Sequence, residues 1–407
     1  MHLKNPEEVL IEETMSNTPK KTKRESTTRT WIAEPVIAPE FTEEPTCTKF
    51  YVGILKEKKT ISKVIPTISA IFPGFNHLKR CSNQKILLCP VQKESSEREE
   101  TQDCNLSPDD LKTLLRDKGF DLSLLADNLE IISVAAKPPK TKVQANLASK
   151  TWPVNFHPDI RLEAIISGKE FNDNQLESIE KCMQITIEAA KREAIGSKSC
   201  TGSALIVDPE GKILALAASK LDLHPMWHAA MLAIDLVASL QGGGAWKLTQ
   251  ENVKGRIKEI HSSIRAGDYN PAGKRLLEAV APLCYPASLS DIAFPEIEPF
   301  IQIKESKAQR KSKTTAEIMN NKESKSKEGP YLCTGYWVFL LQEPCALCAM
   351  ALLHSRVSKI FCGRKNLYSG VLGSRALLHL LPGLNHRYQV WRGILELQCS
   401  QVSDKKL

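Results

Sequence analysis

The chain has 407 residues, which is more than one typical domain holds, so we expect roughly two or three domains. Its 42% hydrophobic content is typical of a globular protein, and no apolar run approaches the roughly 20 residues that cross a bilayer, which argues against a membrane protein. The 12 cysteines are scattered, apart from Cys345 and Cys348, which excludes a dense disulfide scaffold. A net charge of +8 permits a polyanionic partner without requiring one.

The N-terminal segment, residues 1–45, mixes charges, Ser, Thr and Pro without apolar periodicity, and this predicts a disordered tail. The run Lys20-Lys21-Thr22-Lys23-Arg24 is a candidate nuclear-import patch or simply a solvated charge run. Early acids and the lack of an apolar stretch argue against a secretory signal. We therefore expect an intracellular protein of the nucleus and cytoplasm.

Residues 46–136 show short Ile-, Leu- and Val-rich runs separated by helical patterns. The expected strands lie at 50–55, near 75–79, at 85–90 and at 129–134, and the expected helices at 61–71 and from Ser107-Pro108 onward. The order βαββαβ predicts an N-terminal α+β ferredoxin-like domain. Such a sheet is a common scaffold for RNA contact and also for protein pairing, and the pattern alone does not choose between them.

Residues 137–151 are basic and contain Pro138 and Pro139, which predicts an interdomain linker. Lys140 and Lys142 in this linker are candidate phosphate contacts. The second domain is expected to begin near Trp152 and to span 152–407.

The second domain alternates strand and helix patterns, which predicts an α/β/α sandwich. The expected elements are a helix at 174–193, a hairpin at 204–215, the helix bearing His228, a strand at 336–341, a helix from Pro344 and a strand at 359–362. An insertion covers about 241–328, and its Lys-, Ser- and Glu-rich end at 304–328 is expected to be disordered.

The stretches His228-Ala229-Ala230 and Pro344-Cys345-Ala346-Leu347-Cys348 follow the zinc-deaminase signature H-x-E and P-C-x-x-C, except at one position. In that signature one His and two Cys hold Zn²⁺ and the Glu transfers protons. Here Ala230 stands at the Glu position, and its methyl group cannot exchange a proton. The sequence therefore predicts a zinc site, His228, Cys345 and Cys348, that binds metal without turnover.

Other assignments of these residues remain open from the sequence. His224 lies four positions before His228, so it could replace or join it, although Pro225 places His224 at the helix boundary. The three residues could also be a core histidine and two buried thiols. Asp235 lies about 10 Å along the helix, too far to replace the missing Glu. Glu343 is closer, but it is more simply a charge that supports the start of the cysteine helix.

Four blocks resemble those of tRNA adenosine deaminases, in the same order and spacing. They are His228 to Ala230, Glu343 to Met350, Gly370 to Ser374 and Pro382 to Arg387. The run Tyr331 to Tyr336, His224-Pro225 and the extra N-terminal domain resemble the non-catalytic subunit of the eukaryotic wobble-adenosine deaminase. The resemblance implies a cytidine-deaminase-like fold with Zn²⁺, in a heterodimer with a catalytic subunit that converts adenosine-34 of tRNA to inosine. It also implies that the domain at 46–136 binds tRNA.

Two other functions compete with that of a deaminase subunit: a stand-alone RNA-binding protein on an inactive deaminase fold, and an active deaminase of free nucleosides or bases. The missing Glu argues against the second. Arg375 and Arg387, with Arg392 and Lys365, are candidate RNA or interface contacts, and Asn385 is a candidate base contact or a support for the metal loop.

Overall fold

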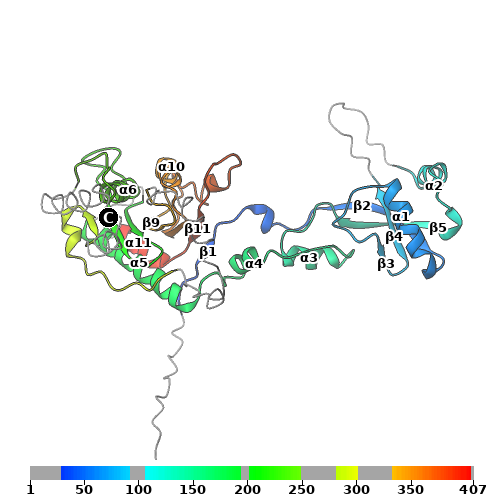
Figure 1. Cartoon of the computed structure of the whole chain (residues 1–407), viewed down its shortest axis with the longest axis horizontal. Helices are drawn as coiled ribbons and strands as arrows, with labels where there is room; N and C mark the ends of the chain where they lie inside the picture. Colours follow the sequence, from blue (N-terminus) through cyan, green and yellow to red (C-terminus); the bar gives the residue numbers. More distant parts are fainter. Residues whose placement is uncertain (1–28, 92–105, 194–200, 249–280, 301–331, 405–407) are drawn as a thin grey trace, which may run out of the picture.

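The computed structural model describes residues 29–91, 106–193, 201–248, 281–300 and 332–404. These residues form two bodies joined by a narrow connector (Figure 1). The N-terminal body contains a four-stranded sheet, and the C-terminal body contains a seven-stranded sheet.

The N-terminal body has ferredoxin-like topology, as predicted. Its elements are β2 (Cys47–Leu55), α1 (Ile61–Ile71), β3 (Cys81–Ser82), β4 (Lys85–Pro90), α2 (Pro108–Asp117) and β5 (Leu125–Ala135). The strands pair antiparallel in the order β3-β4-β2-β5. Ser107 caps α2 by accepting the N–H of Asp110, and α1 and α2 bury Val64, Ile68, Leu111 and Leu115 in one hydrophobic core. The short strand expected near 75–79 lies instead at Cys81–Ser82. Residues 75–78 form a turn closed by the bond from Leu78 N–H to Phe75 O, and Leu78 makes only an isolated bridge with Val154.

The other face of this sheet is covered by chain that the sequence assigned to the linker and to the second domain. Helix α3 (Lys142–Ser149) follows the two prolines, and its Ala148 packs with Trp152 against Phe50 and Leu87. The indole N–H of Trp152 donates to the carbonyl oxygen of Lys79 at 2.6 Å. The second domain therefore does not begin at Trp152, which belongs to the N-terminal body.

The C-terminal body is built on a mixed sheet in the order β1-β11-β10-β9-β6-β7-β8. The strands are β1 (Glu34–Pro35), β6 (Ser203–Val207), β7 (Ile213–Ala218), β8 (Leu283–Tyr285), β9 (Trp337–Gln342), β10 (Lys359–Arg364) and β11 (Gln389–Arg392). Strands β9, β10 and β11 are parallel, and β6 pairs antiparallel with both β7 and β9. The inner strands β6, β7 and β9 are buried at every position, as expected for a sheet covered on both faces.

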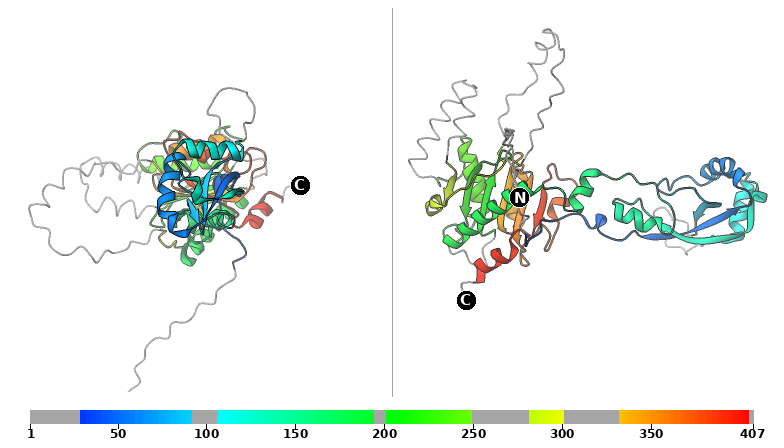
Figure 2. Two further views of the ribbon diagram at one scale, coloured as in Figure 1. Left: turned by 90° about the vertical axis from the view of Figure 1, so that its right-hand side faces the viewer. Right: turned by 90° about the horizontal axis from the view of Figure 1, so that it is seen from below.

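Helices cover both faces of this sheet (Figure 2). Helices α6 (Ala229–Leu240) and α10 (Ala346–His354) pack on one face, and α5 (Asp173–Arg192) and α11 (Glu396–Asp404) pack on the other. The predicted α/β/α sandwich is confirmed. None of the helices in the described part of the chain is long and apolar enough to cross a membrane.

The prediction of a disordered tail is wrong for residues 29–45. Strand β1 pairs antiparallel with β11 at the edge of the C-terminal sheet, and Trp31 is buried with its indole N–H donating to Glu180 at 3.0 Å. The segment has no periodicity of its own because its order comes from a strand partner more than 350 residues away. Residues 1–28, with Lys20 to Arg24, lie outside the described residues.

The predicted insertion returns to the body before its expected end. Strand β8 pairs parallel with β7, and the Phe300 ring stacks on Trp337 with centroids 3.9 Å apart. Residues 241–248 and 281–300 of the insertion are therefore described, and the segment at 304–328 lies outside the described residues.

Candidate metal centre

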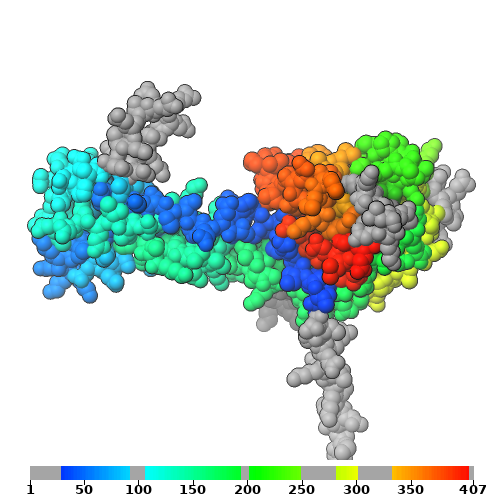
Figure 3. Space-filling view, turned by 180° about the vertical axis from the view of Figure 1, so that it is seen from behind, coloured from blue at the N-terminus to red at the C-terminus, as the bar shows by residue number. Residues whose placement is uncertain are grey.

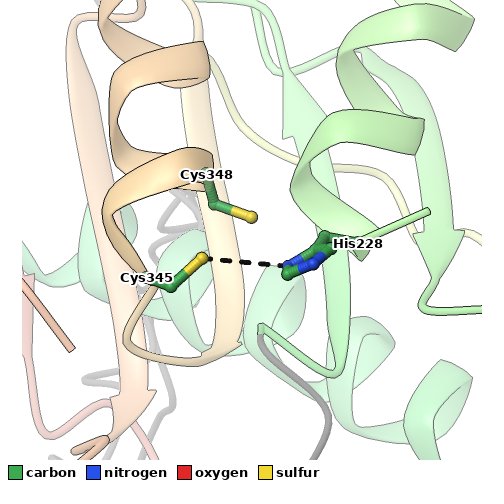
Figure 4. A group of neighbouring side chains, drawn as sticks. All are labelled: His228, Cys345 and Cys348. Atoms are coloured by element: carbon green, nitrogen blue, oxygen red, sulfur yellow. Dashed lines mark hydrogen bonds between the residues drawn. The ribbon is translucent and has the colours of Figure 1, made fainter. Parts of the chain in front are cut away.

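The three predicted metal ligands come together where two helices of one layer begin. His228 is the N-cap residue of α6, Cys345 is the N-cap residue of α10, and Cys348 lies in the first turn of α10. Their ligand atoms all lie within 4.8 Å of one another, and Sγ of Cys345 lies 3.8 Å from Nδ1 of His228 (Figure 4). Because α6 and α10 pack in one core, the fold itself brings these residues together.

The chemistry of this donor set fits a tetrahedral metal ion. With Zn–S and Zn–N distances of about 2.3 and 2.0 Å, tetrahedral ligands stand roughly 3.5 to 3.8 Å apart, close to the observed spacing. Both cysteines lie at a helix N-terminus, where the partial positive charge of the unpaired N–H groups favours thiolates. Cys348 is fully buried, while His228 and Cys345 are partly exposed, so a fourth ligand can enter from the side of these two.

Ala230 lies in the first turn of α6, two positions after His228. It is fully buried in the core between the helices and the sheet, and its N–H lies 3.4 Å from Oγ1 of Thr201. The side chain is a methyl group, which can neither take a proton from bound water nor give one to a leaving amine. The second position after His228 therefore offers neither an acid nor a base.

Glu343 does not replace that acid, because its carboxylate is held by another loop. It is 4% exposed and accepts the N–H groups of Leu372 at 2.7 Å and Ser374 at 3.0 Å, together with the Ser374 hydroxyl. The close approach requires glycine at 370, where a Cβ would lie 2.5 Å from the Glu343 carboxyl carbon. Glu343 therefore anchors the loop at 366–374, which packs on the start of α10 through the bond from Val371 N–H to Pro344 O.

The other candidates for the missing acid or the ligand also have partners away from the site. Asp235 accepts the N–H groups of Ala245 at 2.5 Å and Trp246 at 3.4 Å, and burial raises the pKa of its carboxyl. His224 accepts the N–H of Met226 through Nδ1, and its ring stacks on Trp227. Within the described part of the chain, the structure thus groups His228, and not His224, with the two cysteines.

The candidate RNA contacts divide into two sets. Arg375, Arg387, Lys365 and Lys142 have exposed side chains, as does Asn385. By contrast, Lys140 pairs with Glu40 at 2.6 Å, and Arg392 holds Glu34 through two hydrogen bonds of 2.9 and 2.7 Å. These ion pairs were not predicted, because their partners Glu34 and Glu40 lie in the segment that was expected to be disordered.

No family model matches the chain. It is 29% identical to the human "probable inactive tRNA-specific adenosine deaminase-like protein 3" over 91% of each chain. It is 28% identical to the Danio rerio protein of that name, over 92% of this chain and 94% of the relative. The chain is therefore similar to these proteins along nearly its whole length. The Arabidopsis thaliana "tRNA-specific adenosine deaminase TAD3" is 27% identical over 89% of this chain and 94% of the relative.

The similarity to these adenosine deaminase-like proteins extends over both bodies, because the alignment with the Danio rerio protein covers 92% of this chain. Among solved structures, one described as a study of A-to-I editing by tRNA:A34 deaminases matches at 13% identity with a TM-score of 0.27, covering 54% of this chain and 97% of that one.

Proposed function

We propose that this protein is the non-catalytic, zinc-binding subunit of a tRNA adenosine deaminase that converts adenosine-34 to inosine, in a heterodimer with a catalytic subunit. The observation that carries the proposal is the pairing of a His/Cys/Cys metal group with an alanine at the proton-transfer position. The names of the relatives support it, since they combine tRNA-specific adenosine deaminase with "probable inactive" or with "subunit".

In this proposal His228, Cys345 and Cys348 hold the zinc ion. A bound zinc ion lowers the pKa of a bound water in deaminases, and hydrolytic deamination then needs a group that carries protons from that water to the leaving amine. Ala230 cannot do this, and the carboxylates of Glu343 and Asp235 are occupied by backbone N–H groups elsewhere. The chain's own site therefore performs no turnover.

The role left for the metal is structural. It ties the start of α6 to the start of α10, which are 117 residues apart in the chain. These two helices form one layer of the sandwich. A cross-link between such distant segments restricts the unfolded chain more than it restricts the folded one. The intact layer then presents this face of the body to a partner.

A division of labour with a catalytic subunit is physically sensible. A deaminase must extrude its target base into a pocket, while affinity and register come largely from contacts with the RNA backbone elsewhere. The N-terminal body, which stands apart from the metal centre, provides a second surface for such contacts (Figure 1).

The test is reconstitution. Inosine at position 34 of a tRNA transcript is measured for this chain alone, for the catalytic partner alone and for the two coexpressed, with zinc counted in each preparation. The proposal predicts inosine only from the mixture, and its loss with Cys345→Ser but not with the matched control Cys47→Ser, an exposed cysteine outside the metal group. Tight tRNA binding by this chain without a partner, and no gain of activity in the mixture, would favour the stand-alone RNA-binding protein.

A further inference from the structure

The connector between the two bodies has two parts, which lie together between the bodies (Figure 3). The outgoing arm, residues 36–46, leaves the C-terminal sheet after β1 and enters the N-terminal body at β2. The returning arm, residues 136–159, follows β5, packs α3 and Trp152 onto the N-terminal sheet and then leads to α4 (Ile160–Ile166). These two segments are the covalent connections between the two bodies.

One buried polar side chain joins the two arms. Gln144, in the first turn of α3, is 7% exposed, and its Nε2 donates to the carbonyl oxygens of Glu40 at 2.9 Å and Glu43 at 2.8 Å on the outgoing arm. Its Oε1 accepts the N–H of Lys140 at 2.9 Å on its own arm. Both amide hydrogens and the amide oxygen of Gln144 are thus hydrogen-bonded. Because all these bonds need one orientation of the amide, the side chain is fixed in place.

Each arm is fixed close to this junction. On the outgoing arm Val36 donates its N–H to Val390 of the C-terminal sheet at 2.8 Å, so only residues 37–39 separate that sheet from Glu40. On the returning arm, α3 carries Gln144 at its first turn and Ala148 near its last, and Ala148 packs with Trp152 in the core of the N-terminal body. The amide of Gln144 therefore lies between a segment rooted in one body and a helix rooted in the other.

Two further contacts strengthen the same junction. The Lys140 ammonium pairs with Glu40 and lies 5.5 Å from the centroid of the Phe41 ring. The N–H of Lys142 donates to the Glu163 carboxylate of α4 at 2.7 Å. The Lys140–Glu40 ion pair is exposed and contributes little by itself. Removal of the buried Gln144 amide, by contrast, leaves the carbonyl oxygens of Glu40 and Glu43 without their donor.

We propose that Gln144 is a positioning residue that locks the connector into a strut and so sets the separation of the two bodies. The inference rests on the proposed function for its consequence: a tRNA held by both bodies benefits from a preset distance, because the second contact then forms at a high effective concentration. An RNA held by the C-terminal body alone gains nothing from the strut. Loss of the lock therefore affects a full-length tRNA and spares a short one.

The experiment uses the heterodimer with the catalytic partner and three variants of this chain. Gln144→Glu turns a carboxylate toward two carbonyl oxygens and opens the junction at nearly constant volume, and Gln144→Leu removes its hydrogen bonds. Val143→Ala, a 62% exposed neighbour on the same helix, is the control. For each, kcat/KM is measured on a full-length tRNA transcript and on its isolated anticodon stem-loop, and small-angle X-ray scattering gives the distribution of overall dimensions.

We expect both Gln144 variants to lose roughly tenfold in kcat/KM on the full-length tRNA, with the stem-loop unchanged and the distribution of dimensions broadened. The inference would be overturned if the Gln144 variants scattered like the wild type and kept the wild-type ratio of kcat/KM between the two substrates. An equal loss on both substrates with a lowered melting temperature would also overturn it, since that is the behaviour of a merely structural residue. If the wild-type heterodimer deaminates neither RNA, the proposed function fails, and the scattering still decides whether Gln144 locks the connector.

Discussion

The thiol sulfur of Cys345 lies 3.8 Å from Nδ1 of His228, although the two residues are 117 positions apart in the chain. Both are N-cap residues, so the contact joins the first turns of α6 and α10. A metal ion held by these two residues would therefore link the two helices at their starts.

Cys345→Ser should remove zinc and destabilise the C-terminal body. We expect about one zinc per chain in the wild type and close to none in the variant, because a hydroxyl is a poor ligand beside one thiolate and one imidazole. With free zinc a thousandfold above its Kd, the lost binding costs about 4 kcal/mol of stability. Elemental analysis and denaturant unfolding measure both quantities. A variant that keeps its zinc would show that Cys345 is not a ligand.

Glu343→Gln should lower stability while leaving zinc binding intact. In the wild type the N–H groups of Leu372 and Ser374 donate to a buried carboxylate. The variant offers them amide hydrogens or a neutral oxygen instead, which should lower the free energy of unfolding by about 2 to 3 kcal/mol. Glu396→Gln, an exposed acid at the start of α11, is the control. Unchanged stability together with lost inosine formation by the heterodimer would instead assign Glu343 to proton transfer.

Arg375→Gln and Arg387→Gln should each weaken tRNA binding by the heterodimer, if these exposed side chains contact phosphates. Each neutralised contact reduces the slope of log K against log salt by about one. Lys191→Gln, on the opposite helix layer at the end of α5, should leave the slope unchanged. Titrations at several salt concentrations give the slopes. If both arginine variants kept the wild-type slope, as Lys191→Gln should, neither arginine would contact an RNA phosphate.

His379 should make the fold less stable at mildly acidic pH. Its Nε2 lies 3.0 Å from the carbonyl oxygen of Val36, and its buried Nδ1 has no hydrogen-bond partner among the residues that the structure describes. Burial lowers the pKa of the imidazole from its usual 6.5. Below pH 6.5 the unfolded chain therefore binds a proton that the folded chain does not. The contribution of neutral His379 is complete above that pH and falls as pH drops toward the folded pKa.

The slope of this loss approaches about 1.4 kcal/mol per pH unit. His379→Gln keeps a donor for Val36 and does not titrate, so its unfolding free energy should depend less on pH between 6.5 and 5. Denaturant unfolding at a series of pH values compares the two proteins. Parallel curves would mean that His379 accepts a proton in the folded state without cost.

Local patterns predicted the elements whose signals are complete within a short window. Helix α1 and strand β4 have the predicted bounds, and Ser107-Pro108 begins α2, because a cap, a proline and an apolar face are all local features. The three ligands were also predicted to meet, since their spacing follows a signature with a known chemistry. The ferredoxin-like topology followed from the order of the elements.

What the sequence did not predict depends on distant partners. Glu34 becomes part of a strand because β11 pairs with it, and Trp152 belongs to the N-terminal body because its ring is buried in one cluster with Phe50 and Leu87. Gln144 in a basic, proline-containing segment gave no sign of burial. In each case the tertiary contact outweighs a weak local preference.

The most direct test of the central claim removes the catalytic acid from the other subunit. The heterodimer is prepared with wild-type chain and a partner whose catalytic Glu is replaced by Gln, and inosine at tRNA position 34 is measured with zinc counted in both subunits. The account predicts a fully zinc-loaded complex that binds tRNA and forms no inosine. Inosine from this complex would contradict it, because the activity would have to come from the site at His228, Cys345 and Cys348 despite Ala230.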